Sequence, residues 1–434
     1  MNYSEAIEFL FGSLPMYQRV GRAAYKANLD NTTRLDAYFG HPHRQYPAIH
    51  VAGTNGKGSV SHMLASVLQE AGYRTGLYTS PHLLDFRERI RINGNPVPRE
   101  AVTGFVNNHS GIIREVSPSF FEMTVAMAFD HFAREKVEVA VIETGMGGRL
   151  DSTNIIRPVL SVITNISLDH MEFLGNDLVS IAREKGGIIK RGVPVVLGPM
   201  EREPRQLLLD MAAGMEATAF QAETSFRPLF HTCSPNGSSL VRIRDTRSGE
   251  TTTYQTDLAG KYQQENLVTF LAAAESLHGH GWDIPAGSIH GGLGSVGVNT
   301  GIMGRWQTIG SNPRSICDIA HNRAGVSVVM EQLGQIPRKT LHVVWGMAGD
   351  KETDAMLSLL PREAHYYFTR AGVPRSMDPV HLQEAAARQG LRGITCSSVK
   401  EAYQAATERA ESEDMIFTGG STFVVADLLQ ALGY

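Results

Sequence analysis

Cysteine is scarce in this chain, which has only three cysteines among 434 residues. Cys233, Cys317 and Cys396 lie far apart in the sequence, so they lack the short spacing of a metal-binding cluster. Their odd number also argues against a disulfide framework. The cysteine content therefore fits a protein of a reducing cytoplasm.

Long apolar runs are also missing. No stretch of eighteen consecutive apolar residues occurs, so we expect no membrane-spanning helix and no membrane partner. The first residues, Met1 to Glu5, lack the basic and then apolar order that a signal peptide has. Together with the cysteine content, these absences predict a cytoplasmic location.

Neither sign of charge dominates the sequence. The chain has 40 Lys and Arg residues against 44 Asp and Glu residues, a formal net charge of −4. This balance does not suggest a polyanionic partner, so we expect no nucleic acid substrate. A chain of 434 residues exceeds one ordinary hydrophobic core, and two domains are expected.

Short β-branched runs alternate with helical patterns over the first half of the chain. This alternation predicts βαβ units and a mostly parallel sheet. Apolar residues at helical spacing predict a helix over 120–134, and a further helix is expected over 263–277. Polar, Thr- and Ser-rich pieces over 220–257 predict a small β insertion. The strands of the alternating series are predicted over residues 48–52, 75–79, 137–143, 159–165 and 193–197.

Glycines concentrate in the stretch 291–299, which predicts a linker or hinge. The alternation of strands and helices restarts after it, so a second α/β domain is expected. We place the domain boundaries at 1–296 and 297–434. The strands of the second domain are predicted over residues 315–319, 341–345, 366–369, 394–397 and 415–418.

The segment from Val51 to Ser59, VAGTNGKGS, is the most informative part of the chain. It follows a predicted strand and precedes a predicted helix, which is the arrangement that binds nucleotide phosphates. Glycines let backbone N–H groups approach the anion, and the helix N-terminus adds partial positive charge. Lys57 would reach the terminal phosphates, and the hydroxyl of Ser59 is placed for Mg²⁺.

This segment departs from the usual phosphate-loop pattern GxxxxGK[ST], because Gly58 separates the lysine from the serine. A plain structural turn before a helix is the alternative interpretation, since such turns are common in α/β proteins. Lysine and serine at the expected places favour nucleotide binding. The nucleotide-binding residues predicted here are Gly53, Thr54, Asn55, Gly56, Lys57, Gly58 and Ser59.

Polar clusters follow four other predicted strands or helices, close to where open α/β sheets bind ligands. Glu143 ends an apolar strand and His170 follows the next one, so both are candidate metal ligands. Magnesium accepts few protein ligands, and Mn²⁺ would tolerate imidazole better. The alternatives are an ion pair of Glu143 with Arg149 and a helix-capping role for His170. The four clusters span residues 79–83, 143–154, 165–170 and 182–189.

Lys185 lies in the last of these clusters. A lysine that is partly buried near a metal loses its proton readily, and its neutral amine can add carbon dioxide to become a carboxylate. The alternative is an ordinary cation on a helix surface.

These motifs in this order, GTNGKGS, TSPHL, ETGMGGRLDSTN, SLDH and REKGGI, resemble the folylpolyglutamate synthase branch of the Mur ligase superfamily, of bacterial type. Asp318-Ile319-Ala320-His321-Asn322 is similar to a motif of the superfamily's second domain. The resemblance runs from about Ile49 to the last helix. Cell-wall ligases of the superfamily usually have Thr where Gly58 and Ser59 stand here.

The resemblance implies roles for the matching residues. Lys57 contacts phosphate, Asn266 lies near the nucleotide, and Arg305 reaches ATP from the second domain. Asp318 and His321 contact the nucleotide or close the domains. Alternatives are a helix-interior amide for Asn266, a surface ion pair for Arg305 and local loop bonds for Asp318 and His321. The implied metal set is Ser59, Ser80, Glu143, His170 and a carboxylated Lys185, of which Glu143, His170 and Lys185 are also counted as catalytic with Lys57.

The resemblance also implies an α/β fold with a P-loop ATPase-like first domain, of the Mur ligase central type, and a Rossmann-like C-terminal glutamate-ligase domain. Its activity is ATP- and Mg²⁺-dependent addition of L-glutamate to dihydropteroate or to folates through an acyl phosphate, by a monomer whose domains close about residues 291–301. Members are bifunctional dihydrofolate synthase/folylpolyglutamate synthases or monofunctional folylpolyglutamate synthases. Arg87 and Arg89 either contact the pterin or form a solvated row.

Three other functions compete with this interpretation. A P-loop kinase or ATPase would need neither Lys185 nor a second domain with Asp318 and His321. A non-catalytic nucleotide-binding protein would be expected to lack Lys57, Glu143 or His170. Another Mur-type amide ligase acting on UDP-linked substrates usually has an additional N-terminal domain, whereas the phosphate loop here begins at Val51.

Overall fold

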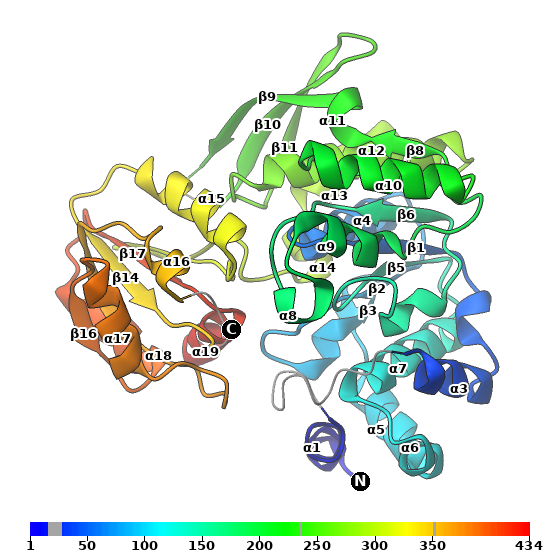
Figure 1. The fold of residues 1–434 in the computed structure, drawn as a ribbon, viewed down its shortest axis with the longest axis horizontal. Helices are drawn as coiled ribbons and strands as arrows, with labels where there is room; N and C mark the ends of the chain where they lie inside the picture. The colour runs from blue at the N-terminus through cyan, green and yellow to red at the C-terminus, as the bar shows by residue number, and fades with distance from the viewer. Residues whose placement is uncertain (16–27, 235–236, 350–352) are drawn as a thin grey trace. The chain divides into compact units, whose positions relative to one another are not determined.

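The computed structural model describes residues 1–15, 28–234, 237–349 and 353–434, and it divides into two compact units (Figure 1). Unit 1 contains most of the first 302 residues and unit 2 contains most of the rest. The units are not continuous in sequence, because two short segments near the β insertion belong to unit 2. Unit 1 comprises Met1–His231, Leu240–Thr256 and Gln263–Ile302, and unit 2 comprises Thr232–Ser239, Asp257–Tyr262 and Met303–Tyr434.

The main sheet of unit 1 is mostly parallel, as the sequence predicts. Its strands are β1 (Ala48–Ala52), β2 (Thr75–Tyr78), β3 (Ile90–Ile92), β4 (Asn95–Pro96), β5 (Val139–Glu143), β6 (Leu160–Ile163), β7 (Val195–Leu197) and β8 (Ala219–Gln221). Their order is β4-β3-β2-β5-β1-β6-β7-β8, and only the pairs of β3 with β2 and β4 are antiparallel. All residues of β1 and β5 are buried, which is typical of parallel strands covered on both faces.

Two buried cores lie side by side along one face of this sheet, the face that carries Ala48 and Ala52 of β1. One core joins the β1–β2–β5 part of the sheet to α1, α5 and α7, and the other joins β6 and β7 to α9 and α10. The helices of unit 1 are α1 (Tyr3–Ser13), α3 (Asp30–Tyr38), η2 (Pro42–Arg44), α4 (Lys57–Glu70), η3 (Phe86–Arg89), α5 (Arg99–Asn108), α6 (Ser110–Val116), α7 (Phe120–Arg134), η4 (Ser152–Ile155), α8 (Met171–Leu174), α9 (Leu178–Gly186), α10 (Arg202–Gly214), α11 (Ala222–Ser225), α12 (Gln263–Gly279), α13 (Ala286–Gly294) and α14 (Val296–Thr300).

The predicted β insertion is present as a separate three-stranded sheet. Its strands are β9 (Phe226–Cys233), β10 (Ser239–Asp245) and β11 (Thr251–Thr256), in the order β11-β10-β9. Buried and exposed residues alternate along β10, so this small sheet packs through one face only.

The prediction of a linker over residues 291–299 is wrong, because α13 and α14 occupy this stretch. Its glycines serve close packing: a Cβ on Gly292 would lie 2.6 Å from the Cα of Val67 in α4. The hydroxyl of Ser66 in α4 also donates a hydrogen bond of 2.7 Å to the carbonyl oxygen of Gly292. A glycine-rich segment can form closely packed helices or a flexible linker, and the composition of the segment does not distinguish the two.

Unit 2 is built around a second, mostly parallel sheet with the strand order β12-β13-β17-β14-β15-β16. Only the pair of β12 with β13 is antiparallel. Its strands are β12 (Gln307–Ser311), β13 (Arg314–Cys317), β14 (Leu341–Trp345), β15 (Ala364–Phe368), β16 (Gly393–Thr395) and β17 (Met415–Gly419). Its helices are α15 (Arg323–Gly334), α16 (Thr353–Leu357), α17 (Pro379–Arg388), α18 (Val399–Arg409) and α19 (Thr422–Ala431).

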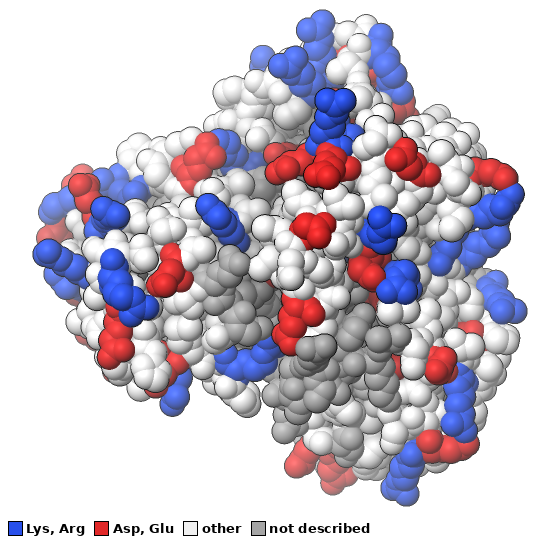
Figure 2. Space-filling view, in the orientation of Figure 1, with Lys and Arg blue, Asp and Glu red and all other residues white. Residues whose placement is uncertain are grey.

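Two surface properties follow from the described residues. None of the helices in the described ranges is both long enough and apolar enough to cross a bilayer. Figure 2 shows basic and acidic side chains interspersed over the face in view, which agrees with the small net charge of −4.

Candidate active site

The predicted phosphate loop lies between β1, which ends at Ala52, and α4, which begins at Lys57. Gly53 and Gly56 have φ angles of 148° and 83°, and a side chain on either would collide with a neighbouring residue. A Cβ on Gly53 would lie 1.9 Å from Oγ1 of Thr164, and a Cβ on Gly56 would lie 2.2 Å from Oδ1 of Asn266. Both positions therefore require glycine.

A second loop, after β6, holds the phosphate loop in place. The backbone N–H of Thr54 donates to the carbonyl oxygen of Asn165 at 3.0 Å. The N–H of Asn55 donates to Oδ1 of the same asparagine at 2.8 Å, and the hydroxyl of Thr164 donates to the carbonyl of Asn55 at 2.6 Å. The hydroxyl of Thr54 donates to the carbonyl of Ser167 at 3.0 Å. The loop is thus preorganised by bonds to its neighbour.

Lys57 and Ser59 lie at the start of α4. The Nζ atom of Lys57 folds back over the loop and donates to the carbonyl oxygens of Gly53 and Thr54 at 3.1 and 3.2 Å. Ser59 is buried, and its Oγ accepts a hydrogen bond of 3.2 Å from Gln263 at the start of α12. The amide of Asn266 donates to Gln263 at 2.8 Å, so the structure brings Asn266 to the phosphate loop.

Glu143 is the last residue of β5 and pairs with Val51, directly before the phosphate loop. Its carboxylate is buried and accepts a hydrogen bond of 3.1 Å from the backbone N–H of Ser80, which follows β2. Two predicted site residues from neighbouring strand ends therefore meet. Arg149, the alternative partner considered for Glu143, makes an ion pair with Glu184 at 2.8 Å.

His170 is the residue before α8 and has a left-handed backbone conformation with φ 50°. Its backbone carbonyl accepts hydrogen bonds from Phe173 and Leu174 at 2.9 and 3.0 Å. The imidazole makes no capping hydrogen bond to α8, so His170 caps this helix through its backbone, as the alternative interpretation expects.

Lys185 lies in the last turn of α9 and is only 4 % exposed, so the alternative of a surface cation is wrong. Its Nζ donates to the carbonyl oxygen of Gly53 at 2.7 Å, directly at the phosphate loop. Burial, with a smaller effect of the nearby Lys57 charge, lowers the pKa of Lys185 to about 7. A large fraction of this amine is therefore neutral near pH 7 and able to react as a nucleophile.

Two predicted residues of unit 2, Asp318 and His321, lie in the loop after β13, whereas the third, Arg305, precedes β12. Asp318 is buried and accepts hydrogen bonds from the hydroxyl of Tyr262 at 2.6 Å and from backbone N–H groups of Trp306 and Ala320 at 2.7 and 2.8 Å. Burial raises the pKa of Asp318, and the nearby Arg305 charge opposes this rise. Nδ1 of His321 lies 3.0 Å from the carbonyl oxygen of Ile319.

Two known protein families match this chain, and the matched segments contain most of the site residues described above. The family described as "Mur ligase middle domain" matches residues 51–274, and the one described as "Mur ligase, glutamate ligase domain" matches residues 304–422. The dihydrofolate synthase/folylpolyglutamate synthase of Bacillus subtilis is 32% identical over 441 residues, covering 99% of each chain. The chain belongs to the folylpolyglutamate synthase family of the Mur ligase superfamily.

A similar sequence also occurs within longer proteins. A probable bifunctional folylpolyglutamate synthase/dihydropteroate synthase of Haloferax volcanii is 32% identical over 436 residues. The match covers 98% of this chain but 50% of that protein, so this chain spans about half the length of this archaeal relative.

Solved structures of the folylpolyglutamate synthase family share the whole fold. A Mycobacterium tuberculosis folylpolyglutamate synthase complexed with ADP matches with a TM-score of 0.89 and 29% identity, covering 100% of this chain and 98% of that one. The Escherichia coli family member complexed with DHPP and ADP matches with a TM-score of 0.85 and 28% identity, covering 100% and 98%. A bifunctional folylpolyglutamate synthase/dihydrofolate synthase with Mn, AMPPNP and L-glutamate bound matches with a TM-score of 0.84 and 26% identity, with the same coverage.

Among the predicted metal ligands of this folylpolyglutamate synthase family member, the structure brings the carboxylate of Glu143 to the backbone of Ser80. Within the described ranges, no group of three or more His, Cys, Asp and Glu side chains is arranged to bind a metal. The predicted set needs no such group, because it contains one carboxylate, one imidazole and two hydroxyls besides Lys185. Mg²⁺ typically takes one or two carboxylates and completes its shell with water and phosphate oxygens.

The structure also contains supporting residues to which the sequence analysis gave no individual role. Thr164 and Asn165 bind the phosphate loop, and Gln263 joins Ser59 to Asn266. Asp151 accepts hydrogen bonds from the N–H groups of Gly145 and Met146 at 2.8 and 3.0 Å. Asn165 and Asp151 lie in the predicted clusters over 165–170 and 143–154, through the rule that polar groups at strand ends face ligands, whereas Thr164 and Gln263 gave no such signal.

The arginines after the TSPHL motif are not a solvated row. Arg89 is 3 % exposed, donates from Nε to Nδ1 of His82 at 2.7 Å and places its guanidinium 5.1 Å from the ring centroid of Phe120. Burial lowers the pKa of Arg89. Arg87 instead pairs with Asp85 at 2.9 Å.

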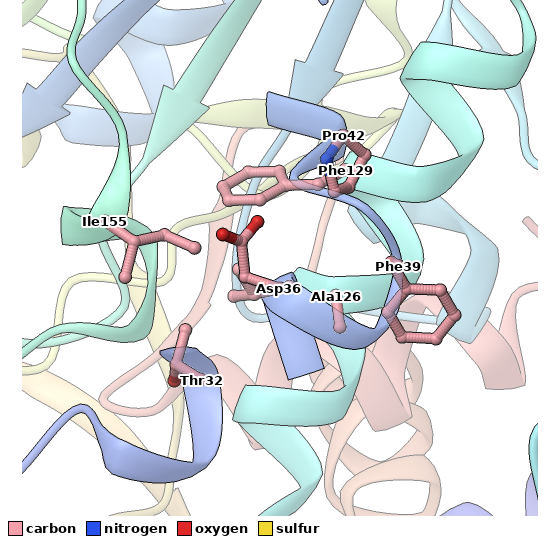
Figure 3. Close-up of a pocket in the computed structure, with 8 residues that line it drawn as sticks. Thr32, Asp36, Phe39, Pro42, Ala126, Phe129 and Ile155 are labelled. Atoms are coloured by element: carbon pink, nitrogen blue, oxygen red, sulfur yellow. The ribbon is translucent and has the colours of Figure 1, made fainter. Parts of the chain in front are cut away.

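A small cavity lies apart from these residues, between α3, η2, α7 and η4 (Figure 3). Its volume of about 10 Å³ is room for roughly one water molecule, so it does not hold a substrate. The carboxylate of Asp36, which lines it, lies 2.6 Å from Nδ1 of His41 and 2.7 Å from Nδ1 of His43. These contacts give the buried Asp36 a structural role.

Proposed function

We propose that this protein is an ATP-dependent ligase that joins L-glutamate to dihydropteroate and to reduced folates that already carry glutamate. The observation that carries the proposal is the buried Lys185, whose Nζ lies 2.7 Å from the carbonyl of Gly53 in a phosphate loop. A kinase or simple ATPase needs no such lysine there. The relatives named dihydrofolate synthase/folylpolyglutamate synthase and the structures with DHPP, ADP and L-glutamate support the substrates.

We assign nucleotide-binding roles to the residues of the phosphate loop because of their positions in the structure. The backbone N–H groups from Gly56 to Ser59 and the Nζ of Lys57 bind the ATP phosphates in this proposal, whereas the N–H groups of Thr54 and Asn55 hold the loop through their bonds to Asn165. Asn266, Arg305, Asp318 and His321 serve nucleotide binding in this proposal. The corresponding domains are residues 1–296 for ATP binding, of the central Mur ligase type, and 297–434 for the glutamate-ligase type.

Ser59, Ser80, Glu143, His170 and Lys185 would hold Mg²⁺ in this proposal. For Lys185 this requires carboxylation: the neutral Nζ attacks the carbon of CO₂, and the lost proton goes to solvent, leaving a carbamate with one negative charge. The pKa of about 7 supplies the neutral amine that this step needs. When bound, the metal neutralises negative charge on the phosphate oxygens.

The proposed reaction has two chemical steps. A substrate carboxylate oxygen attacks the γ-phosphorus of ATP, which gives an acyl phosphate and ADP. The neutral amine of glutamate then attacks the acyl carbon, phosphate leaves with the bonding pair of the broken C–O bond, and the nitrogen loses one proton to solvent. Lys57 and Arg305 stabilise the charge on the transferring phosphoryl group, while the loop amides keep it in line with its acceptor.

Measurement of ADP release tests the proposed function. Release is expected only when ATP, Mg²⁺, L-glutamate and a pterin acceptor are all present. If neither dihydropteroate nor a reduced folate supports glutamate-dependent release, the folate ligase is ruled out. ADP release without glutamate or pterin would instead indicate a kinase or ATPase.

Parallel assays with the two acceptors separate the bifunctional enzyme from the alternative, a monofunctional folylpolyglutamate synthase. Activity with dihydropteroate is expected for the former only. We further propose that the enzyme acts as a monomer and without nucleic acid. Sedimentation of the active protein tests this, because it gives the mass of the active species.

A further inference from the structure

A buried chain of hydrogen bonds connects the central strand β1 to the glycine loop after Glu143. Nε2 of His50, in the middle of β1, lies 2.8 Å from Oγ1 of Thr153. That hydroxyl lies 2.5 Å from Oδ1 of Asp151, which also accepts the backbone N–H of Thr153 at 3.0 Å. The other carboxylate oxygen of Asp151 accepts the N–H groups of Gly145 and Met146.

The direction of each bond in this chain is determined by the donors available. Three backbone N–H groups donate to the carboxylate of Asp151 and hold it as an acceptor, although burial raises its pKa. The single proton of the Thr153 hydroxyl is therefore donated to Asp151, and Oγ1 remains to accept a bond. Consequently His50 carries its proton on Nε2 and is the neutral Nε2–H tautomer.

His50 is an unfavourable choice for the core of a parallel sheet. It is fully buried, and no hydrogen-bond partner is found for its Nδ1 among the described residues. Burial lowers the pKa of His50 to about 3, with a smaller effect of the Lys190 charge, so the ring is neutral. An apolar side chain at this position would avoid an unsatisfied buried nitrogen, whose burial costs free energy. What the histidine adds is the bond to Thr153.

The far end of the chain lies where the proposed site needs precise placement. Gly145 and Met146 follow Glu143 by two and three residues. The same loop packs against the helix that carries Lys185: a Cβ on Gly148 would lie 2.7 Å from the carbonyl oxygen of Lys185. The N–H of Arg149 also donates to the carbonyl of Glu184 at 2.7 Å.

We propose that His50 and Thr153 are positioning residues: through Asp151 they fix the loop of residues 144–148 between Glu143 and Lys185. Neither side chain touches a substrate in this proposal. Its link to ligation rests on the proposed function, whereas the hydrogen-bond chain itself does not.

The experiment compares Thr153→Val, which keeps the side-chain shape and removes the hydroxyl, with Thr153→Ser, which keeps the hydroxyl. Thr153→Val is expected to lower kcat for glutamate-dependent ADP release by about 10- to 100-fold, the usual effect of losing an outer hydrogen bond to a site. ADP affinity, measured by calorimetry, should stay unchanged because the phosphate loop is untouched. Thr153→Ser should restore most of kcat. Equal activity of the two variants, or a Thr153→Val variant with the wild-type kcat, would overturn the proposal.

The His50→Leu variant separates a positioning role from a purely structural one, because the two roles predict different combinations of kcat and melting temperature. It is expected to keep or raise the melting temperature, because it removes a buried unsatisfied nitrogen, and yet to lower kcat. A loss of kcat that only accompanies a fall in melting temperature would contradict a positioning role.

Histidine NMR of the wild-type protein tests the chain without any activity. ¹⁵N spectra are expected to show His50 as the neutral Nε2–H tautomer at pH 7. A ring protonated on Nδ1 would overturn the proposal, even if the variants fail to fold. If wild-type protein releases no ADP with glutamate and either pterin, the proposed function fails, while the NMR result still decides the hydrogen-bond chain.

Discussion

The Nζ atom of Lys185 and the carbonyl oxygen of Gly53 lie 2.7 Å apart, although 132 positions separate them in the sequence. This contact places a buried amine at the loop proposed to bind ATP phosphates. Its pKa of about 7 makes the amine reactive where an ordinary lysine would be inert.

Removal of this amine is expected to abolish ligation. Lys185→Ala should lower glutamate-dependent ADP release by at least about 100-fold, because the carboxylate proposed to support the metal is lost. Circular dichroism should show an intact fold. Lys400→Ala, on an exposed position of α18, is the matched control and should leave activity unchanged. Near-normal activity of Lys185→Ala would rule out the hypothesis that ligation depends on a carboxylated Lys185.

Carboxylation of Lys185 should depend on pH in a definite direction. Because the pKa is lowered to about 7, the neutral and reactive amine increases as pH rises through 7 and is scarce at pH 6. Protein freed of CO₂ and then given ¹³C-bicarbonate should show a carbamate signal that grows faster at pH 8 than at pH 6. No carbamate signal at either pH would contradict the prediction.

Gly56→Ala should weaken nucleotide binding. The residue has φ 83°, and the added Cβ would lie 2.2 Å from Oδ1 of Asn266. The loop must shift, and we expect the ADP dissociation constant from calorimetry to rise by about tenfold or more, equivalent to about 1.4 kcal/mol. Gly104→Ala, inside α5 with no atom within 4 Å of the new Cβ, serves as the control and should leave ADP binding unchanged.

Gly292→Ala tests the packing of α13 on α4. The new Cβ would lie 2.6 Å from the Cα of Val67, so overpacking should lower the free energy of unfolding by about 1 to 3 kcal/mol in urea denaturation. Gly287→Ala in the same helix meets nothing within 4 Å. If both variants are equally stable, the segment is loose and the linker interpretation returns.

His50 should contribute to acid sensitivity. Its pKa is lowered by burial to about 3 in the fold, against about 6.5 in the unfolded chain, so the unfolded state binds the additional proton between these values. This contribution to stability is complete above pH 6.5 and decreases by about 1.4 kcal/mol per pH unit as pH falls below it. Urea unfolding at pH 7 and pH 5 should therefore show a smaller loss for His50→Leu than for wild type. Equal losses would indicate that His50 is not neutral in the fold.

The sequence best predicts those helices and strands that have both a periodic apolar pattern and a recognisable residue motif at one end. The helix predicted over 120–134 matches α7, where Ser119 and Glu122 form a capping box and an apolar face enters the core. The motifs at the strand ends likewise identify Glu143 and Ser80, which meet in the structure. Each of these features is local in sequence.

Features that depend on distant neighbours could not be predicted. Gly292 looks like a linker residue until Val67 is placed beside it, and Arg89 looks solvated until His82 and Phe120 surround it. Gln263 and Asn165 support the phosphate loop only because α12 and the loop after β6 fold against it. Their chemistry is ordinary, and their position alone gives them a role.

The two lysines that share one carbonyl oxygen imply a thermodynamic linkage. Lys57 and Lys185 both donate to Gly53, and the charge of Lys57 lowers the pKa of Lys185. Lys57 must give up this bond to reach a phosphate, so arrival of the nucleotide changes the electrostatic environment of Lys185. By reciprocity, a change at Lys185 alters nucleotide affinity by the same factor. In the proposed mechanism, ATP and CO₂ would therefore be mutual effectors through a single peptide group.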